Sequence, residues 1–330
     1  MNAVIESGRA AAGALHAPRL RVFHWLVRRE LWEHRGIWLA PLICAAIILA
    51  AAVFGQVDFG APQSPGEAAT GGSFGTAATF WARAALLALG TPFYFVLLFT
   101  QFFYALNSLY EDRKDRSVLF WKSLPASDLE TVLSKLFVAA VVMPLLAVAI
   151  TVVTQMLLAL VAVVRVDEVA AELSRAFGPR AGEAAEAFVH ALGNPRLWLL
   201  DFLPRLLLLA LAYGLWTLPI VGFALLVSAA SPRSPAVIAF LIPAAIGLAE
   251  KLAFNSDWLS RQIGIHAFGA IVGSGTGEVV SGAGGPTGLA PVARHFASQV
   301  ASTDLWGGLV VGVVLVAAAV WARRYRDENT

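Results

Sequence analysis

Residues Leu133–Val164 read LSKLFVAAVVMPLLAVAITVVTQMLLALVAVV, a run in which Lys135 is the only charged residue. A helix needs roughly 20 apolar residues to cross the hydrocarbon core of a bilayer. Five other runs in the chain also reach this length. The sequence therefore predicts an all-α membrane protein with six transmembrane helices, at about 36–55, 79–109, 133–164, 203–228, 235–254 and 304–322.

The composition agrees with lipid as the main solvent of the chain. Hydrophobic residues make up 58% of the sequence and charged residues 14%, whereas soluble domains carry about 25% charged residues. The net charge of +2 is too small to indicate a nucleic-acid partner. Cys44 is the only cysteine, which excludes an intrachain disulfide and a cysteine-based metal site.

The segment before the first predicted span has the pattern of an interfacial amphipathic helix. Over Leu20–Arg35 the spacing predicts one face with Val22, Trp25, Leu26, Arg29 and Trp32, flanked by Arg21, Arg28 and Arg35. The apolar stretch Ile37–Phe54 could also be the core of a signal peptide. We favour a first span, because a long patterned segment precedes it and five more apolar runs follow.

Lysine and arginine are distributed unevenly between the two sets of connecting segments. Segments 1–35, 110–132, the link at Arg233 and 323–330 carry 14 of them, against 6 in 56–78, 165–202 and 255–303. Cytoplasmic segments carry the excess of positive charge. We therefore expect a cytoplasmic N-terminal segment over 1–35, a six-span domain over 36–322 and a cytoplasmic tail over 323–330.

The predicted outer segments differ in character. Residues 56–78 are rich in Gly, Ala, Ser and Pro, which is typical of a flexible connection. Residues 167–192 predict two short helices broken at Gly178-Pro179. Residues 255–303 combine apolar pieces with a glycine-rich run, so a helical or re-entrant segment is expected there before the last span.

The predicted inner loop Tyr110–Lys135, YEDRKDRSVLFWKSLPASDLETVLSK, carries the most information about function. A charged run opens it, and an apolar patch that a water-facing loop would normally avoid follows. Pro125 ends the short helix, and Ser127 with Glu130 forms a capping box that starts the next one. The residues alone leave two interpretations open: a helix lying on lipid headgroups or a docking site for a protein.

This loop resembles that of the ABC-2 type permeases, the transmembrane subunits of bacterial ABC exporters. The shared features are the charged run Glu111–Arg116, the apolar helix Ser117–Ser123, the turn Leu124–Ser127 and Lys135 at the foot of the third span. The resemblance implies that the loop is a coupling helix between spans 2 and 3, docking into a cytoplasmic ATPase. The implied ATPase-coupling residues are Glu111, Asp112, Arg113, Arg116, Ser117, Leu119, Phe120, Trp121, Leu124 and Pro125.

The same resemblance implies the rest of the assembly. The permease would lie in the bacterial cytoplasmic (inner) membrane and pair with a second copy or a paralogue and with cytoplasmic ABC ATPase subunits. ATP and Mg would be held by those ATPase subunits, with no cofactor bound by this chain. The sequence has no phosphate-binding G-x-x-x-x-G-K-[ST], and the glycine-rich run from Gly273 lacks the lysine. H-E-x-x-H is also absent and the six histidines are scattered, so we do not expect an enzyme.

Two alternatives remain: an ion-coupled secondary transporter, and a membrane scaffold or sensor subunit that transports nothing. Ionisable residues near the predicted spans bear on the first. Arg83, Asp201, Arg205, Glu250 and Lys251 all fall near the outer ends, where anchoring and local pairing are expected, and no acidic residue falls at mid-membrane. This placement disfavours ion coupling.

The second span is rich in aromatic residues. Phe95, Phe99, Phe102 and Phe103 are candidates for lining a hydrophobic translocation path, although ordinary helix packing and lipid contact explain the same pattern. Prolines at 92, 144, 204, 219 and 243 interrupt the spans, as is common in membrane helices generally.

Overall fold

A computed structural model of the chain describes residues 19–55, 74–114, 127–177, 179–232, 234–272 and 289–326. Within these ranges the secondary structure is helical and contains no strand, as the sequence predicts. The helices of the first half are α2 (Arg19–Glu33), α3 (Gly36–Phe54), α4 (Phe74–Lys114), α6 (Asp128–Phe137), η1 (Val138–Val142), α7 (Met143–Val164), α8 (Val166–Phe177) and α9 (Pro179–Leu192). Those of the second half are α10 (Pro195–Leu197), η2 (Trp198–Phe202), α11 (Leu203–Trp216), α12 (Leu218–Ala230), α13 (Pro235–Phe254), α14 (Trp258–Val272), α16 (Leu289–Val300) and α17 (Thr303–Arg326).

Six helices in the described ranges are long and apolar enough to cross a membrane, which confirms the predicted multi-pass architecture. The fourth differs most from its predicted bounds, because it begins earlier and breaks at Thr217, after which α12 continues as a shorter apolar helix. The six helices are Gly36–Phe54, Ala88–Lys114, Asp128–Val164, Pro195–Trp216, Pro235–Phe254 and Thr303–Tyr325.

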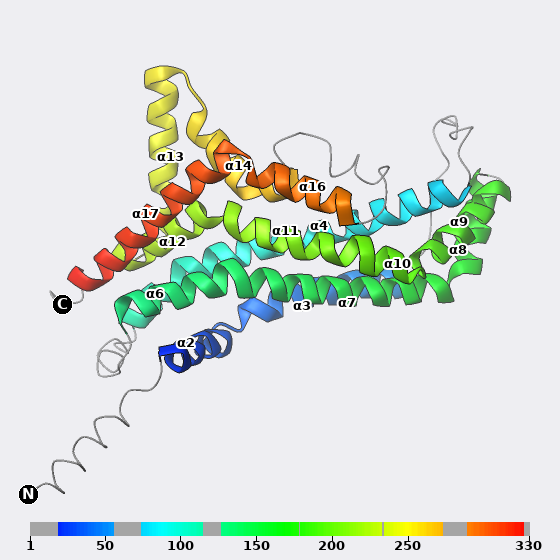
Figure 1. Cartoon of the computed structure of the whole chain (residues 1–330), viewed down its shortest axis with the longest axis horizontal. Helices are drawn as coiled ribbons and strands as arrows, with labels where there is room; N and C mark the ends of the chain where they lie inside the picture. The colour runs from blue at the N-terminus through cyan, green and yellow to red at the C-terminus, as the bar shows by residue number, and fades with distance from the viewer. Residues whose placement is uncertain are drawn as a thin grey trace, which may run out of the picture.

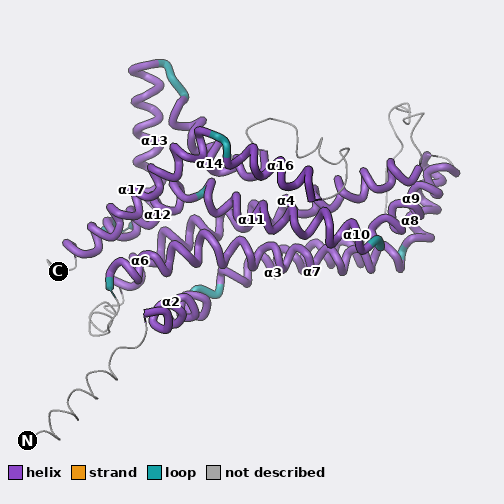
Figure 2. Tube along the Cα trace, in the orientation of Figure 1, coloured by secondary structure: helices purple, strands orange, loops and turns teal. Residues whose placement is uncertain are grey.

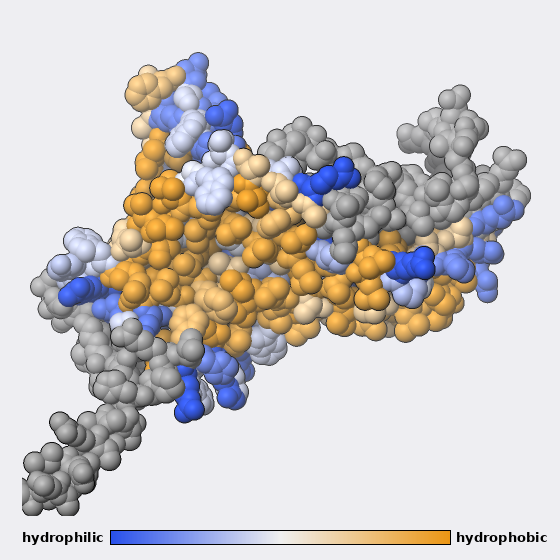
Figure 3. All heavy atoms as spheres, in the orientation of Figure 1, coloured by the Kyte–Doolittle hydropathy of each residue, from blue (hydrophilic) through white to orange (hydrophobic). Residues whose placement is uncertain are grey.

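The long helices α3, α4, α7 and α11 run lengthwise beside one another, α17 crosses one end of this bundle obliquely beside α12, and α13 stands out from it (Figure 1). The tube in Figure 2 shows the same separation of α13. Hydrophobic side chains cover most of the visible face of the bundle in Figure 3, and hydrophilic ones gather toward its ends and the tip of α13. This distribution fits a protein whose sides face lipid.

The segments predicted to lie on one side of the membrane gather at one end of the bundle. This end holds α2, the start of α6 and the end of α17 (Figure 1). The other end holds α8 and α9, the two short helices predicted to break at Gly178-Pro179. There the Arg165 guanidinium donates to the carbonyl oxygens of Ala52 (2.7 Å) and Gly55 (3.1 Å) and so caps the end of α3.

Two π-helical turns precede the prolines of the third and fourth spans. In η1, the Met143 N–H bonds to the Val138 oxygen five residues back, and Pro144 has no N–H with which to continue the pattern to Ala139. The freed Ala139 oxygen accepts a hydrogen bond from Gln101 Nε2 at 2.9 Å. A side chain of the second span thus satisfies a backbone group that the proline leaves unpaired.

Gln101 makes two further polar contacts inside the bundle, one through each atom of its amide group. Tyr213 donates its hydroxyl proton to Gln101 Oε1 at 2.7 Å, and Gln101 Nε2 also lies 3.3 Å from the Thr217 hydroxyl oxygen. Gln101, Tyr213 and Thr217 are all buried. Because an unpaired polar group is costly in hydrocarbon, this set fixes how α4, η1 and α11 pack.

Helix α11 approaches the π-helical turn very closely at Gly214. A Cβ added at Gly214 would lie 2.1 Å from the Ala140 backbone oxygen. We therefore expect Gly214→Ala to destabilise the fold by about 1–3 kcal/mol, because the backbones must separate. Thermal unfolding in detergent should show a lower Tm.

Gly264→Ala is the matched control, since nothing lies within 4 Å of a Cβ at this helical position of α14. Alanine favours helix over glycine, so the control should be neutral or slightly stabilising. Equal Tm values for the two variants would contradict the close contact between α11 and η1.

Helix α2 forms where the amphipathic pattern predicts it, and only part of its apolar face meets the bundle. Leu26 and Glu30 are buried against the bundle, whereas Trp25 and Trp32 are 64% and 71% exposed. Leu26 therefore faces the protein and the two tryptophans do not. The reason is that α2 packs against α6, where Phe23 meets Phe137 edge to face at 5.6 Å.

Candidate functional site

Charged side chains from four helices converge at the end of the bundle where the described chain stops at Lys114 and resumes at Ser127. Asp112 lies in the last turn of α4, and Asp128 and Lys135 lie in α6 beyond the loop. Arg29 and Glu30 come from α2, and Arg323 comes from the end of α17. We call this set of six side chains the charge network.

Lys135 lies at the centre of the charge network. Its side chain has no exposed surface, and its Nζ lies 2.8 Å from Glu30 Oε1 and 3.3 Å from Asp112 Oδ2. Glu30 Oε2 accepts a hydrogen bond from the Tyr104 hydroxyl at 2.9 Å. Glu30 and Asp112 are 2% and 5% exposed, so these charges interact at a much lower effective dielectric constant than surface pairs do.

Two arginines complete the surroundings of Asp112. Arg29 Nη2 lies 3.1 Å from Asp112 Oδ1, and Arg323 Nη1 lies 3.4 Å from Oδ2. Arg323 Nε also contacts Asp128 Oδ1 at 3.1 Å. Three cations of the charge network are thereby balanced by three carboxylates, a condition for burying charge without a large penalty.

Arg29 is held in its charged form by its neighbours. Burial lowers the pKa of its guanidinium, but the hydrogen bond to Glu33 and the charge of Asp112 outweigh this effect and raise the pKa above its ordinary value. The contact to Glu33 Oε1 is 2.6 Å long and spans one turn of α2. Arg29 thus connects an exposed carboxylate to the buried network.

Helix α12 is tied to the same end of α4 by hydrogen bonds in which the α12 side supplies a hydroxyl and carbonyl oxygens. The Ser228 hydroxyl oxygen accepts hydrogen bonds from the backbone N–H groups of Leu109 (3.1 Å) and Tyr110 (3.0 Å). Arg113 donates to the carbonyl oxygens of Ser228 and, at 2.9 Å, Ser231. Five helices, α2, α4, α6, α12 and α17, are therefore joined around the two ends of the loop.

The predicted capping box at the start of α6 is confirmed. Ser127 Oγ accepts a hydrogen bond from the Glu130 N–H at 3.2 Å, and Glu130 Oε2 accepts one from the Ser127 N–H at 2.9 Å. The cap fixes where α6 begins. It therefore sets the point from which the 115–126 loop leaves the helix.

The residues predicted for ATPase coupling fall into two groups. Asp112 and Arg113 belong to the buried contacts described above, while Glu111 is 51% exposed and lies 3.7 Å from His34 Nδ1. The other predicted residues lie outside the described ranges: Arg116, Ser117, Leu119, Phe120, Trp121, Leu124 and Pro125.

Three of the four candidate path residues are exposed, and Phe102 is partly buried against the core. Phe95, Phe99 and Phe103 are 43%, 60% and 43% exposed. The Phe102 ring is 5.7 Å from that of Phe240 in α13, and the Phe95 ring is 6.0 Å from that of Phe268 in α14. Within one chain, these aromatic residues face α13, α14 and the surroundings.

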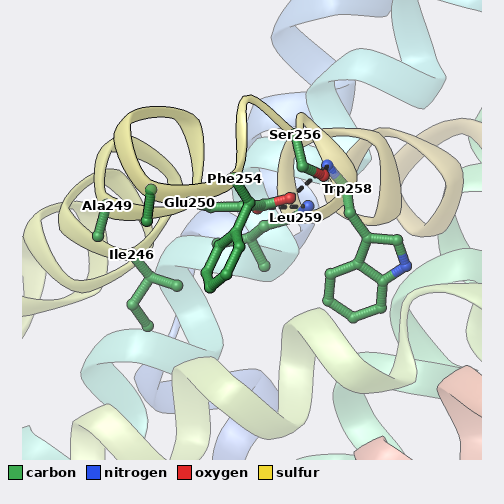
Figure 4. Close-up of a pocket in the computed structure, with 8 residues that line it drawn as sticks. Ile246, Ala249, Glu250, Phe254, Ser256, Trp258 and Leu259 are labelled. Atoms are coloured by element: carbon green, nitrogen blue, oxygen red, sulfur yellow. Dashed lines mark hydrogen bonds between the residues drawn. The ribbon is translucent and has the colours of Figure 1, made fainter.

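The ionisable residues at the tip of α13 pair locally, as predicted. Glu250 accepts hydrogen bonds from the backbone N–H groups of Trp258 (2.7 Å) and Leu259 (3.0 Å) and so caps α14 (Figure 4). Lys251 Nζ lies 2.8 Å from Asp257 Oδ2. A shallow apolar hollow opens beside Glu250, between Ile246, Phe254 and Trp258. The side chains of Arg83 and Asp201 are outside the described set.

Sequence reasoning did not single out Glu30 or the role of Arg323. Glu30 follows Leu26 by four residues, so it lies on the same buried face of α2. An acidic residue on the apolar face of an amphipathic helix is a signal for a buried cation partner, but the sequence does not show which cation that is.

Comparison of the chain with protein-family models, with curated proteins and with solved structures finds no match in any of the three. The functional argument therefore depends on the geometry and on the sequence motif. Within the described residues no three His, Cys, Asp or Glu side chains are grouped as a metal site. The charge network is suited to holding helix ends together and transmitting their movement.

Removing the central cation should be strongly destabilising. Lys135→Met leaves Glu30 and Asp112 buried without their shared cation, and we expect a loss of about 3–5 kcal/mol. The exposed pair Lys251–Asp257 has the same 2.8 Å distance, with side chains 48% and 70% exposed. Lys251→Met should therefore cost less than about 1 kcal/mol.

A double-mutant cycle separates pairing from packing. Because Glu30→Gln removes the uncompensated carboxylate, it should restore part of the stability that Lys135→Met loses, giving a coupling energy of at least about 1 kcal/mol. Chemical or thermal unfolding in detergent measures each step. Additive losses, or equal losses for Lys135→Met and Lys251→Met, would rule out a structural role for this buried pair.

Proposed function

We propose that this chain is the transmembrane permease subunit of an ATP-driven ABC-2 type transporter, working as an exporter in a bacterial cytoplasmic membrane. Its partners would be cytoplasmic ABC ATPase subunits, which hold ATP and Mg, and a second permease copy or a paralogue. The single observation that carries the proposal is the charge network. It joins four helices, α2, α4, α6 and α17, at the base of the segment that resembles a coupling helix.

The mechanism follows from this connection. Closure of the ATPase subunits around ATP would push on the short helix within residues 117–124. Because Asp112 precedes the loop and Asp128 and Lys135 follow it, a push there acts on both flanks together. Glu30 and Arg323 would pass the displacement to α2 and α17. Buried ion pairs suit this task because they resist separation.

The charge network also weighs against the ion-coupled alternative. Among the described residues, Glu30 and Asp112 are the buried carboxylates, and both are paired with cations at the end of the bundle. A carrier driven by protons or sodium would use a carboxylate that gains and loses its ion within the membrane. A scaffold that recruits a cytoplasmic partner without transport remains the other alternative.

The docking step is tested by the double variant F120E/W121E. Charged side chains in the apolar patch should prevent the ATPase from docking, because a carboxylate would have to be buried without a partner. We expect ATPase subunits to stop co-purifying with the permease from its native membrane. Any ATP hydrolysis that remains should no longer be coupled to transport.

The control F254E/W258E changes two exposed aromatic residues near the tip of α13, which are 80% and 56% exposed. It should leave ATPase co-purification intact, and both variants should keep the wild-type Tm. ATPase capture by F120E/W121E, with coupled hydrolysis, would refute docking at the loop. Transport that continues without any ATPase and stops when the proton gradient collapses would favour the secondary transporter.

A further inference from the structure

The outward face of α2 carries an alternating stripe of cationic and indole side chains. Arg21, Trp25, Arg28 and Trp32 are all exposed, and their spacing of three and four residues places them along one side of the helix. Arg35, also exposed, follows α2 in the turn before α3 and completes the stripe. Glu33, an exposed acidic residue nearby, is engaged by Arg29 at 2.6 Å. All the charged residues of the stripe itself are arginines.

Arg28 lies between the two tryptophans. Its guanidinium carbon is 5.4 Å from the Trp25 ring centroid and 5.6 Å from that of Trp32. Both distances are within the range of cation–π attraction. The two indole rings therefore orient Arg28, while the side chain remains exposed and its N–H groups stay available to an anionic ligand.

The opposite face of α2 fixes this stripe relative to the bundle. Glu30 bonds to Lys135 at 2.8 Å, Arg29 bonds to Asp112 at 3.1 Å, and Phe23 packs against Phe137. Helix α2 therefore cannot turn its arginines inward without breaking buried ion pairs. The stripe faces away from the protein.

The position of α2 identifies the surroundings of the stripe. Helix α2 ends at Glu33 and the first candidate span begins at Gly36, so Arg28 lies about two turns, and Arg21 about four turns, before the point where the chain enters the apolar bundle. Tryptophan is enriched at the headgroup level of membranes, and arginine binds phosphate through paired N–H donors. The position of the two tryptophans beside a membrane span favours a lipid surface over a protein partner.

We propose that this stripe binds the phosphate groups of anionic phospholipids, with Arg28 as its central contact and Arg21 and Arg35 beside it. The inference does not depend on the proposed ATP-driven function, because it uses only the exposed face of α2. Anionic headgroups would bind the exposed face of α2, while the charge network binds its buried face to the bundle.

The test is native mass spectrometry of the full-length protein in detergent, titrated with phosphatidylglycerol or phosphatidylcholine. We expect the wild type to retain phosphatidylglycerol preferentially. The variant R21Q/R28Q/R35Q should weaken phosphatidylglycerol binding by at least about tenfold and leave phosphatidylcholine binding unchanged. Arg28→Lys should weaken it severalfold, because lysine keeps the charge but loses the planar, stacked donor.

The control R175Q/R196Q/R261Q removes three exposed arginines outside α2 and should retain the preference. A second control, W306A/W321A, matches W25A/W32A because the four rings are 57–71% exposed; only W25A/W32A should reduce binding. All variants should keep the wild-type Tm. The proposal is overturned if the stripe and control variants bind phosphatidylglycerol alike, or if the wild type shows no preference between the lipids.

Discussion

The packing of the helices at the predicted cytoplasmic end depends on the ion pairs made by the ammonium group of Lys135. It is fully buried, 2.8 Å from Glu30 and 3.3 Å from Asp112. An unpaired ammonium here would be prohibitively costly, so both carboxylates must be in place when the helices pack. This requirement fixes α2 and the end of α4 against α6, and Arg323 extends it to α17.

A different constraint operates deeper in the bundle. Pro144 cannot bond to the Ala139 oxygen, and Gln101 supplies the missing donor from the neighbouring span. Tyr213 then orients Gln101 through its other polar atom. Neutral polar groups thus organise the middle of the bundle and ion pairs organise one end. This division is what the cost of charge in a membrane demands.

Features that depend on residues close together in the sequence could be predicted from it. The six apolar runs, the α8–α9 break and the Ser127–Glu130 capping box are visible as local patterns, and the structure contains each of them. The faces of α2 were not predictable, because Trp25 and Leu26 are both apolar and only the packing against α6 decides which is buried.

The charge network shows the same limit for the candidate site. Asp112 and Lys135 could be singled out because they flank the loop, but Glu30 lies 105 residues from Lys135 in the sequence. One sequence does not reveal which distant charges pair. The apolar pattern of α13 likewise does not reveal that this helix stands away from the bundle.

The central claim is that the charge network and the loop it surrounds face the cytoplasm. Because Cys44 is the only cysteine, a Cys44→Ala background permits single cysteines at exposed Glu111 and exposed Arg175, near opposite ends of the bundle. A membrane-impermeant thiol reagent applied to intact cells without an outer-membrane barrier should label Arg175→Cys at once. It should label Glu111→Cys only after the cytoplasmic membrane is permeabilised. Labelling of Glu111→Cys in intact cells would contradict the proposed orientation, and with it ATPase docking at this end.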